Sequence, residues 1–194
     1  MRFKFAALLA GALFFTASAF ASPVGGVFCA GHANGSTFTS LNAGGITATA
    51  WSTGGASETL VCKAGGVGEM GVGISGDEDN EIDSDDFVQL DISGLNLAQV
   101  TIESVQSNEG FQIFGSNSNG VLGGTSLAMN SDGSVTQSVT LNTQGFKFLD
   151  ITATTGNVLV DSVTTPEPSS YFLMGTGLLM LGFMMRRKFA SASL

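Results

Sequence analysis

The segment Phe87-Val88-Gln89-Leu90-Asp91-Ile92-Ser93 decides the expected fold. Its apolar residues Val88, Leu90 and Ile92 alternate with the polar residues Gln89 and Asp91. Successive side chains of a strand point to opposite faces of a sheet, so this pattern places the three apolar side chains together. The segment therefore predicts a strand with one buried face.

The same alternation recurs along the chain, and no long stretch shows helical periodicity. Further strands are expected at 46–52, 58–64, 98–105, 110–116, 134–141, 146–151 and 157–163. The turn residues 53–57 predict a hairpin between the first two, and the glycine-rich stretch 65–73 is expected to be a loop or a bulged strand. Because about nine to eleven short strands follow one another without helices, the sequence predicts an all-β fold, a single β-sandwich or jelly-roll-like domain.

The N-terminus has the pattern of a secretory signal peptide. Arg2 and Lys4 precede an apolar run at 5–15, and Ala19-Phe20-Ala21 has the small residues of a cleavage signal at its first and third positions. An uncleaved anchor is the alternative, but the apolar run is short for a membrane span of ~20 residues. We expect a signal peptide at 1–21.

The C-terminal segment 165–194 combines a short polar motif, an apolar run and a basic cluster. Pro166-Glu167-Pro168 is followed by apolar residues at 171–185 and then by Arg186-Arg187-Lys188. A helix over the run would be about 22 Å long, somewhat shorter than a hydrocarbon core of ~30 Å. The basic cluster is expected to stop transfer and to stay in the cytoplasm, which places the preceding body outside the inner membrane.

These three parts, in this order, resemble the PEP-CTERM sorting domain. The resemblance implies that exosortase, a membrane-embedded transpeptidase-like enzyme, cuts the tail near the Pro-Glu-Pro motif. It implies a transient anchor in the inner membrane, followed by release or transfer of the body to the cell surface. It also implies a bacterium that makes exopolysaccharide, with a role in biofilm. An ordinary single-pass anchor is the alternative.

The body between these ends, residues 22–164, is strongly acidic. Of 16 acidic and 7 basic residues in the chain, one acidic and five basic residues lie in the ends. The body therefore has 15 acidic residues against Lys63 and Lys147, a formal charge of −13. Such a surface repels phosphate backbones, so nucleic acid is not an expected partner, whereas cations or neutral polysaccharides are.

Cys29 and Cys62 are the two cysteines of the chain. In an exported protein an even pair favours a disulfide, and two buried free thiols are the alternative. Closing a loop of about 30 residues would stabilise the fold by ~3–4 kcal/mol in the chain-entropy model.

The segment 77–86 contains seven carboxylates in ten residues. Its alternate acids are candidate ligands for Ca²⁺, because Ca²⁺ prefers several oxygen ligands; they are Asp77, Asp79, Glu81, Asp83 and Asp85. The EF-hand pattern is excluded, since Ile82 stands where that loop needs glycine. A solvated acidic loop is the alternative.

No catalytic motif is recognisable in the body. His32 is the only histidine and lies in a loop rich in Gly and Asn, and Trp51, the only tryptophan, is expected in the core. We therefore expect a non-enzymatic structural or adhesive protein of the surface or extracellular matrix. A Ca²⁺-dependent polysaccharide-binding module is the alternative function.

Overall fold

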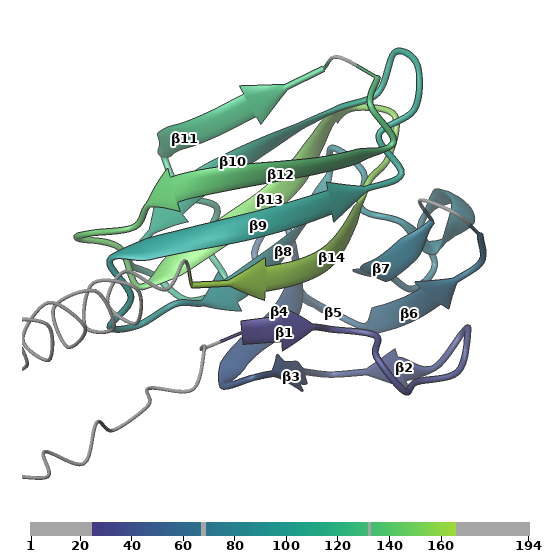
Figure 1. The fold of residues 1–194 in the computed structure, drawn as a ribbon, viewed down its shortest axis with the longest axis horizontal. Coiled ribbons are helices and arrows are strands. Elements are labelled where there is room, and N and C mark those ends of the chain that lie inside the picture. Colours follow the sequence, from purple (N-terminus) through teal and green to yellow (C-terminus); the bar gives the residue numbers. More distant parts are fainter. Residues whose placement is uncertain (1–24, 67–68, 132, 166–194) are drawn as a thin grey trace, which may run out of the picture.

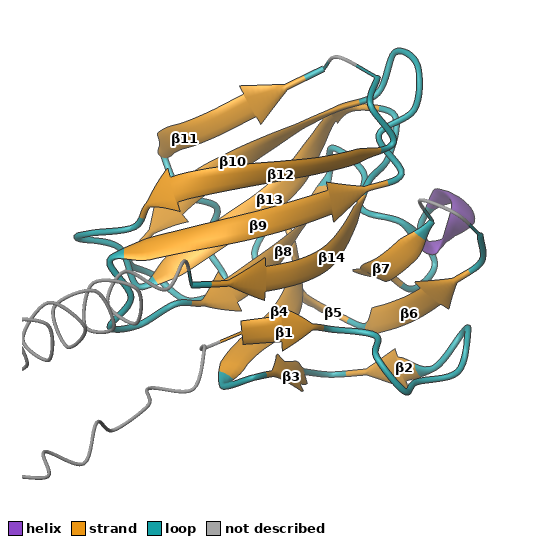
Figure 2. Cartoon of the chain, in the orientation of Figure 1, coloured by secondary structure: helices purple, strands orange, loops and turns teal. Residues whose placement is uncertain are grey.

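The computed structural model describes residues 25–66, 69–131 and 133–165. These residues form fourteen strands in two antiparallel sheets, together with one short 3₁₀ helix (Figures 1 and 2). The expected signal peptide at 1–21 lies outside the described residues. The same holds for the Pro-Glu-Pro motif, the apolar run at 171–185 and the basic cluster at 186–188.

The two sheets have seven strands each. In the first sheet the order is β12 (Thr136–Asn142), β9 (Leu97–Glu103), β14 (Leu159–Thr164), β7 (Met70–Ile74), β6 (Leu60–Ala64) and β2 (Thr37–Phe38), and β1 (Gly25–Val27) also pairs with β14. In the second sheet it is β11 (Thr125–Asn130), β10 (Gly110–Ser116), β13 (Phe148–Thr155), β8 (Asp86–Asp91), β4 (Ile46–Ser52) and β3 (Leu41–Ala43), and β5 (Ser57–Glu58) also pairs with β4.

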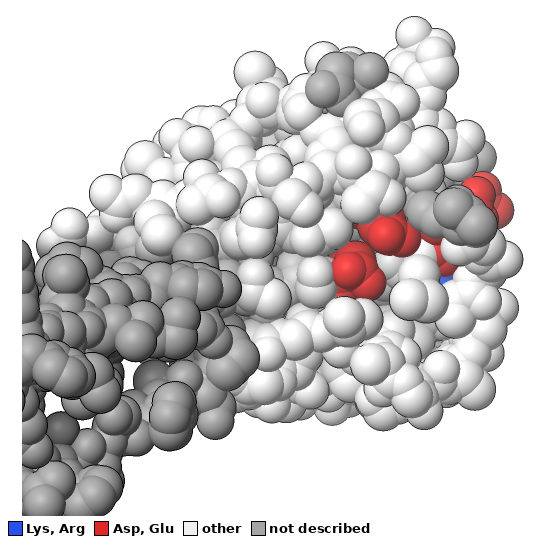
Figure 3. Space-filling view, viewed as in Figure 1, with Lys and Arg blue, Asp and Glu red and all other residues white. Residues whose placement is uncertain are grey.

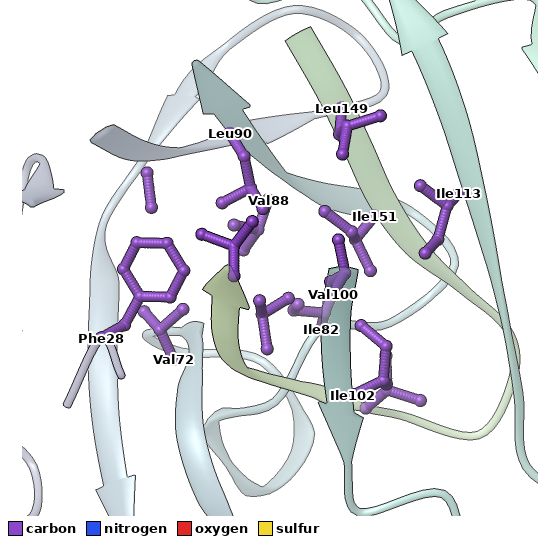
Figure 4. Packing of buried hydrophobic residues seen from close by; sticks show 14 of the residues in the cluster. Phe28, Val72, Ile82, Val88, Leu90, Val100, Ile102, Ile113, Leu149 and Ile151 are labelled. Atoms are coloured by element: carbon purple, nitrogen blue, oxygen red, sulfur yellow. The ribbon is translucent and has the colours of Figure 1, made fainter. Parts of the chain in front are cut away.

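One hydrophobic core lies between the sheets (Figure 4). Val88 and Leu90 of β8 and Ile151 of β13 enter it from the second sheet, and Val100 and Ile102 of β9 enter it from the first. All five side chains are fully buried. The alternating segment at 87–93 thus forms a strand with its apolar face in the core, and the two facing sheets form a sandwich.

The expected hairpin after β4 is confined to two residue pairs. Strand β5 pairs with β4 only at Ala50↔Glu58 and Trp51↔Ser57, and the chain then crosses to the first sheet as β6. Leu60 and Cys62 of β6 are fully buried in the core. The single strand expected at 58–64 is therefore two strands, because its second part packs its apolar face from the opposite sheet.

A disulfide joins Cys29 to Cys62, with their Cα atoms 5.5 Å apart, which confirms the expected pairing. It attaches the segment after β1 to strand β6. Both sulfur atoms lie within the core cluster. The N-terminal strand is thus covalently held to the first sheet.

Part of the outer face of the second sheet, around Gln89 and Asp150, is covered by the loop at 117–124, which joins β10 to β11. The amide nitrogen of Gln89 donates to Asp150 Oδ1 at 2.8 Å and to the carbonyl of Ser118 at 3.2 Å. The backbone N–H groups of Gly120 and Gly123 donate to Gln89 Oε1 and Asp150 Oδ2. Gln89 and Asp150 are buried as a result, although they lie on the polar side of their strands.

Trp51 lies on this covered outer face and is only partly buried, so the expectation that it belongs to the core was wrong. Gly120 approaches its ring so closely that a Cβ atom there would stand 2.8 Å from the indole carbons. Gly120 also has a φ of +70°, which favours glycine. Trp51 therefore supports the loop at 117–124.

Candidate functional site

The acidic segment at 77–86 connects β7 of the first sheet to β8 of the second. It contains the short 3₁₀ helix Glu78–Asn80, in which Asp79 has a φ of 57° and Asn80 a φ of 59° (Figure 2). Ile82 is fully buried, and its backbone exchanges two hydrogen bonds with Val158, at 2.9 and 3.0 Å. The segment is therefore a turn attached to the core rather than an extended strand.

Glu81 attaches the same segment through an ion pair. Its side chain is 2% exposed and accepts a hydrogen bond from Lys63 Nζ on β6. Burial lowers the pKa of Lys63, but the hydrogen bond and the negative charge of Glu81 outweigh it and raise that pKa overall. Because the carboxylate of Glu81 faces Lys63 inside the fold, its negative charge is already compensated.

Three carboxylates converge beside this anchor: Asp77, Asp83 and Asp86 each place an oxygen within 4.8 Å of the others. Two oxygens that bind one Ca²⁺ at 2.3–2.6 Å can be at most about 5.2 Å apart, so this spacing fits a shared cation. The backbone holds Asp83 in place, because its carbonyl accepts hydrogen bonds from Thr152 Oγ1 at 3.1 Å and from the N–H of Ala153 at 3.3 Å.

Burial and the neighbouring negative charges raise the pKa of two of these carboxyl groups, those of Asp77 and Asp86. The pKa of Asp77 is raised to about 7, by burial first and then by the negative charges of Asp86 and Asp83. The pKa of Asp86 is also raised, by burial and then by the charges of Asp83 and Glu58. Asp77 Oδ2 is buried without a hydrogen-bond partner. Either protons or a cation would relieve this concentration of negative charge.

The five acids expected as ligands are not brought together as a set. Asp77 and Asp83 lie in the converging group, whereas Asp79 and Asp85 are exposed and lie outside it. Glu81 is paired with Lys63 instead. Alternation would have aligned all five only on an extended chain, and the left-handed residues Asp79 and Asn80 break that geometry.

Asp86 is the residue that sequence reasoning missed. It is the first residue of β8 and pairs with Ser52 of β4, so the second sheet fixes its position. Its signal in the sequence was its place at the junction between the acidic segment and a strongly alternating strand. Figure 3 shows acidic side chains gathered over the end of the first sheet near β6 and β7, while the rest of the visible described face is nearly uncharged.

The other residues considered for chemistry have structural contacts. The ring of His32 packs edge-on against Phe38, with centroids 4.7 Å apart. Both cysteines are in the disulfide. Within residues 25–66, 69–131 and 133–165, no helix has the length and apolar character that a membrane crossing requires.

The comparison with protein families identifies the C-terminal segment. The model of the PEP-CTERM protein-sorting motif matches residues 164–188. The chain carries a PEP-CTERM sorting signal. The signal indicates export and exosortase-dependent sorting, and it begins at Thr164, the last residue of β14. No curated protein and no solved structure matches the chain.

Proposed function

We propose that the chain is the precursor of a non-enzymatic surface or extracellular-matrix protein whose two-sheet body is separated from its tail by exosortase. The observation that carries this proposal is the position of the PEP-CTERM signal, which begins where β14 ends. Strand β14 lies inside the first sheet, between β9 on one side and β7 and β1 on the other. A cut after Thr165 would therefore leave every described strand in place.

A structural or adhesive role in exopolysaccharide or biofilm agrees with the chemistry of the body. Its formal charge of −13 favours cations and neutral polymers over polyanions. The ring of His32 packs edge-on against Phe38, and both cysteines form the disulfide. We propose that the body acts by binding or by forming matrix, after transient anchoring in the inner membrane.

Mass spectrometry of the mature protein from exosortase-positive cells tests the sorting step. We expect a C-terminus near Pro166-Glu167-Pro168 and an N-terminus near Ser22. Cells that lack exosortase serve as the control and should retain the tail. A mature protein that extends through Leu194 in the exosortase-positive cells would refute the proposal.

A second candidate function, Ca²⁺-dependent binding of polysaccharide, is favoured by the convergence of Asp77, Asp83 and Asp86. When bound, Ca²⁺ would neutralise the repulsion between these carboxylates. The buried, unpartnered Oδ2 atom of Asp77 could serve as one ligand. Because the three residues belong to the connection between the two sheets, the cation would fix that connection and the surface around it.

Thermal unfolding of the body with Ca²⁺, with Mg²⁺ and with a chelator tests the cation. We expect Ca²⁺ to raise the Tm of the wild type and of the control Asp79→Asn/Asp85→Asn, which removes two exposed charges outside the group. The variant Asp77→Asn/Asp83→Asn should lose the response. An unchanged wild-type Tm in Ca²⁺ would exclude the site, and a glycan array with and without Ca²⁺ would test the polysaccharide.

A further inference from the structure

The two lateral sides of the sandwich end in very different strands. Among the described strands, β2, β3, β5 and β1 on one side are two or three residues long. On the other side the sheets end in β11, with six residues, and β12, with seven. A strand of six residues presents about 20 Å of backbone edge, which is enough to pair with a further strand.

The long edges also lack two of the features by which proteins usually prevent edge strands from pairing, charged residues and proline, although β11 has a bulge where it pairs with β10. Neither β11 nor β12 contains a charged residue or a proline, although the body carries a formal charge of −13. Met129, near the end of β11, is 68% exposed. Charged or proline-containing edge strands resist pairing, so an uncharged edge on such an acidic protein is a surface suited to a partner.

The two long edges are stepped. Figure 1 shows β11 as the outermost strand, beyond β12. The burial agrees with this, because Leu127 and Ala128 pack against the core but are only partly buried, whereas Phe111 and Ile113 of the neighbouring β10 are fully buried. The second sheet therefore extends past the first on this side, and the core-facing side of β11 is incompletely covered.

We propose that this stepped edge pairs with the same edge of a second copy of the chain, β11 of each copy lying antiparallel to β12 of the other. The required symmetry is a two-fold axis parallel to the strands. Rotation about such an axis places the first sheet of one copy in the layer of the second sheet of the other and leaves the direction of every strand unchanged. Because β11 and β12 run in opposite directions within one copy, β11 of one copy is then antiparallel to β12 of the other (Figure 1). Each projecting β11 then fills the place beside the partner's β12, and both sheets continue across the interface.

A second copy fits this surface better than a single peptide does. One added strand would form backbone hydrogen bonds with either β11 or β12 and would leave the other strand at the edge of its sheet. A two-fold related copy satisfies both with strands of matching length and covers the exposed side of Leu127 in each copy. This pairing involves only strands of the body and is independent of the tail.

Sedimentation velocity of the body at increasing concentration tests the pairing. All described strands lie within residues 22–164, so this body can be tested by itself. We expect the wild type to reach twice the monomer mass. The variant Ser126→Lys/Met129→Lys should remain monomeric, because it places two charges on β11 at exposed positions. The control Val121→Lys, at an exposed loop position, should dimerise like the wild type.

The direction of the charge change makes this test specific. Added lysines bring an acidic body closer to neutrality and so favour non-specific association, whereas the proposal expects association to be lost. A wild type that remains monomeric at millimolar concentration would overturn the proposal. A lysine variant that still dimerises would overturn it as well.

Mixing two variants tests the pairing of β11 with β12. The variant Ser138→Asp/Thr140→Asp changes exposed positions of β12 and should be monomeric alone. An equimolar mixture with Ser126→Lys/Met129→Lys should restore the dimer, because lysines of one copy then lie beside aspartates of the other. Amide hydrogen exchange at 125–130 should slow in that mixture. If neither dimer nor protection returns, the proposed arrangement is refuted.

Discussion

The stability of the body should increase as the pH falls, and Asp150 should account for a large part of the increase. Asp150 is fully buried on the outer face of the second sheet, and burial raises its pKa to about 6, although hydrogen bonds from Gln89 and Gly123 oppose that rise. A carboxyl group in an unfolded chain has a pKa of about 3.9. The fold therefore disfavours the ionised form of this side chain.

The sign and the size of the effect follow from this difference. Because the folded state binds the proton more tightly, the contribution of Asp150 to stability is complete below about pH 4 and is lost as the pH rises through about 6. Two pKa units correspond to about 3 kcal/mol. The pKa values of Asp77, Asp86 and Asp161 are raised as well, so they add changes of the same sign.

Urea unfolding of the wild type and of Asp150→Asn between pH 4 and pH 7.5 isolates this contribution. The free energy of unfolding of the wild type should rise by about 3 kcal/mol more than that of the variant as the pH falls. Asp91→Asn, at an exposed position of β8, is the matched control and should keep the wild-type slope. If Asp150→Asn shows the same dependence on pH as the wild type, the reasoning is refuted.

Three further predictions concern other contacts. Reduction of the disulfide should lower the free energy of unfolding by ~3–4 kcal/mol, as urea unfolding with and without a reductant would show. Lys63→Met should lower the free energy of unfolding by about 2–3 kcal/mol, because it leaves the charge of Glu81 uncompensated; the loss is smaller than for a fully buried pair because Lys63 is 20% exposed. The double variant Lys63→Met/Glu81→Leu removes that charge as well and should recover part of the loss in the same urea unfolding experiment. Gly120→Ala should displace the ring of Trp51 and shift its fluorescence, which reports this site alone because the chain has no other tryptophan.

Much of the fold could be predicted because strand alternation is a local property. The segments at 46–52 and 110–116 match β4 and β10, and the alternating apolar residues Val88, Leu90 and Ile92 are those that enter the core. The missed strands carry weaker signals: β1, β2 and β3 are two or three residues long, and β11 alternates poorly because its pairing with β10 contains a register shift.

The candidate site could be predicted only in its location. The density of carboxylates in 77–86 indicated which segment could bind a cation. Which of these carboxylates converge, however, depends on where the chain turns. The left-handed residues Asp79 and Asn80 break the alternation, and the contact with Lys63 draws Glu81 inward. Asp86 joins the group because β4 and β8 fix its position, and pairing between strands so far apart in the sequence leaves no local pattern.

The sequence by itself thus determined the sorting signal, the β class of the body, its acidic charge and the pair of cysteines, since each depends on composition or on short-range spacing. Only the tertiary structure decided which strands belong to which sheet and that the chain crosses between sheets after β5. It also placed Asp150 and Gln89 beneath a loop and left β11 and β12 as the long edges. Those features arise from burial and from pairing between distant segments, which a single strand does not encode.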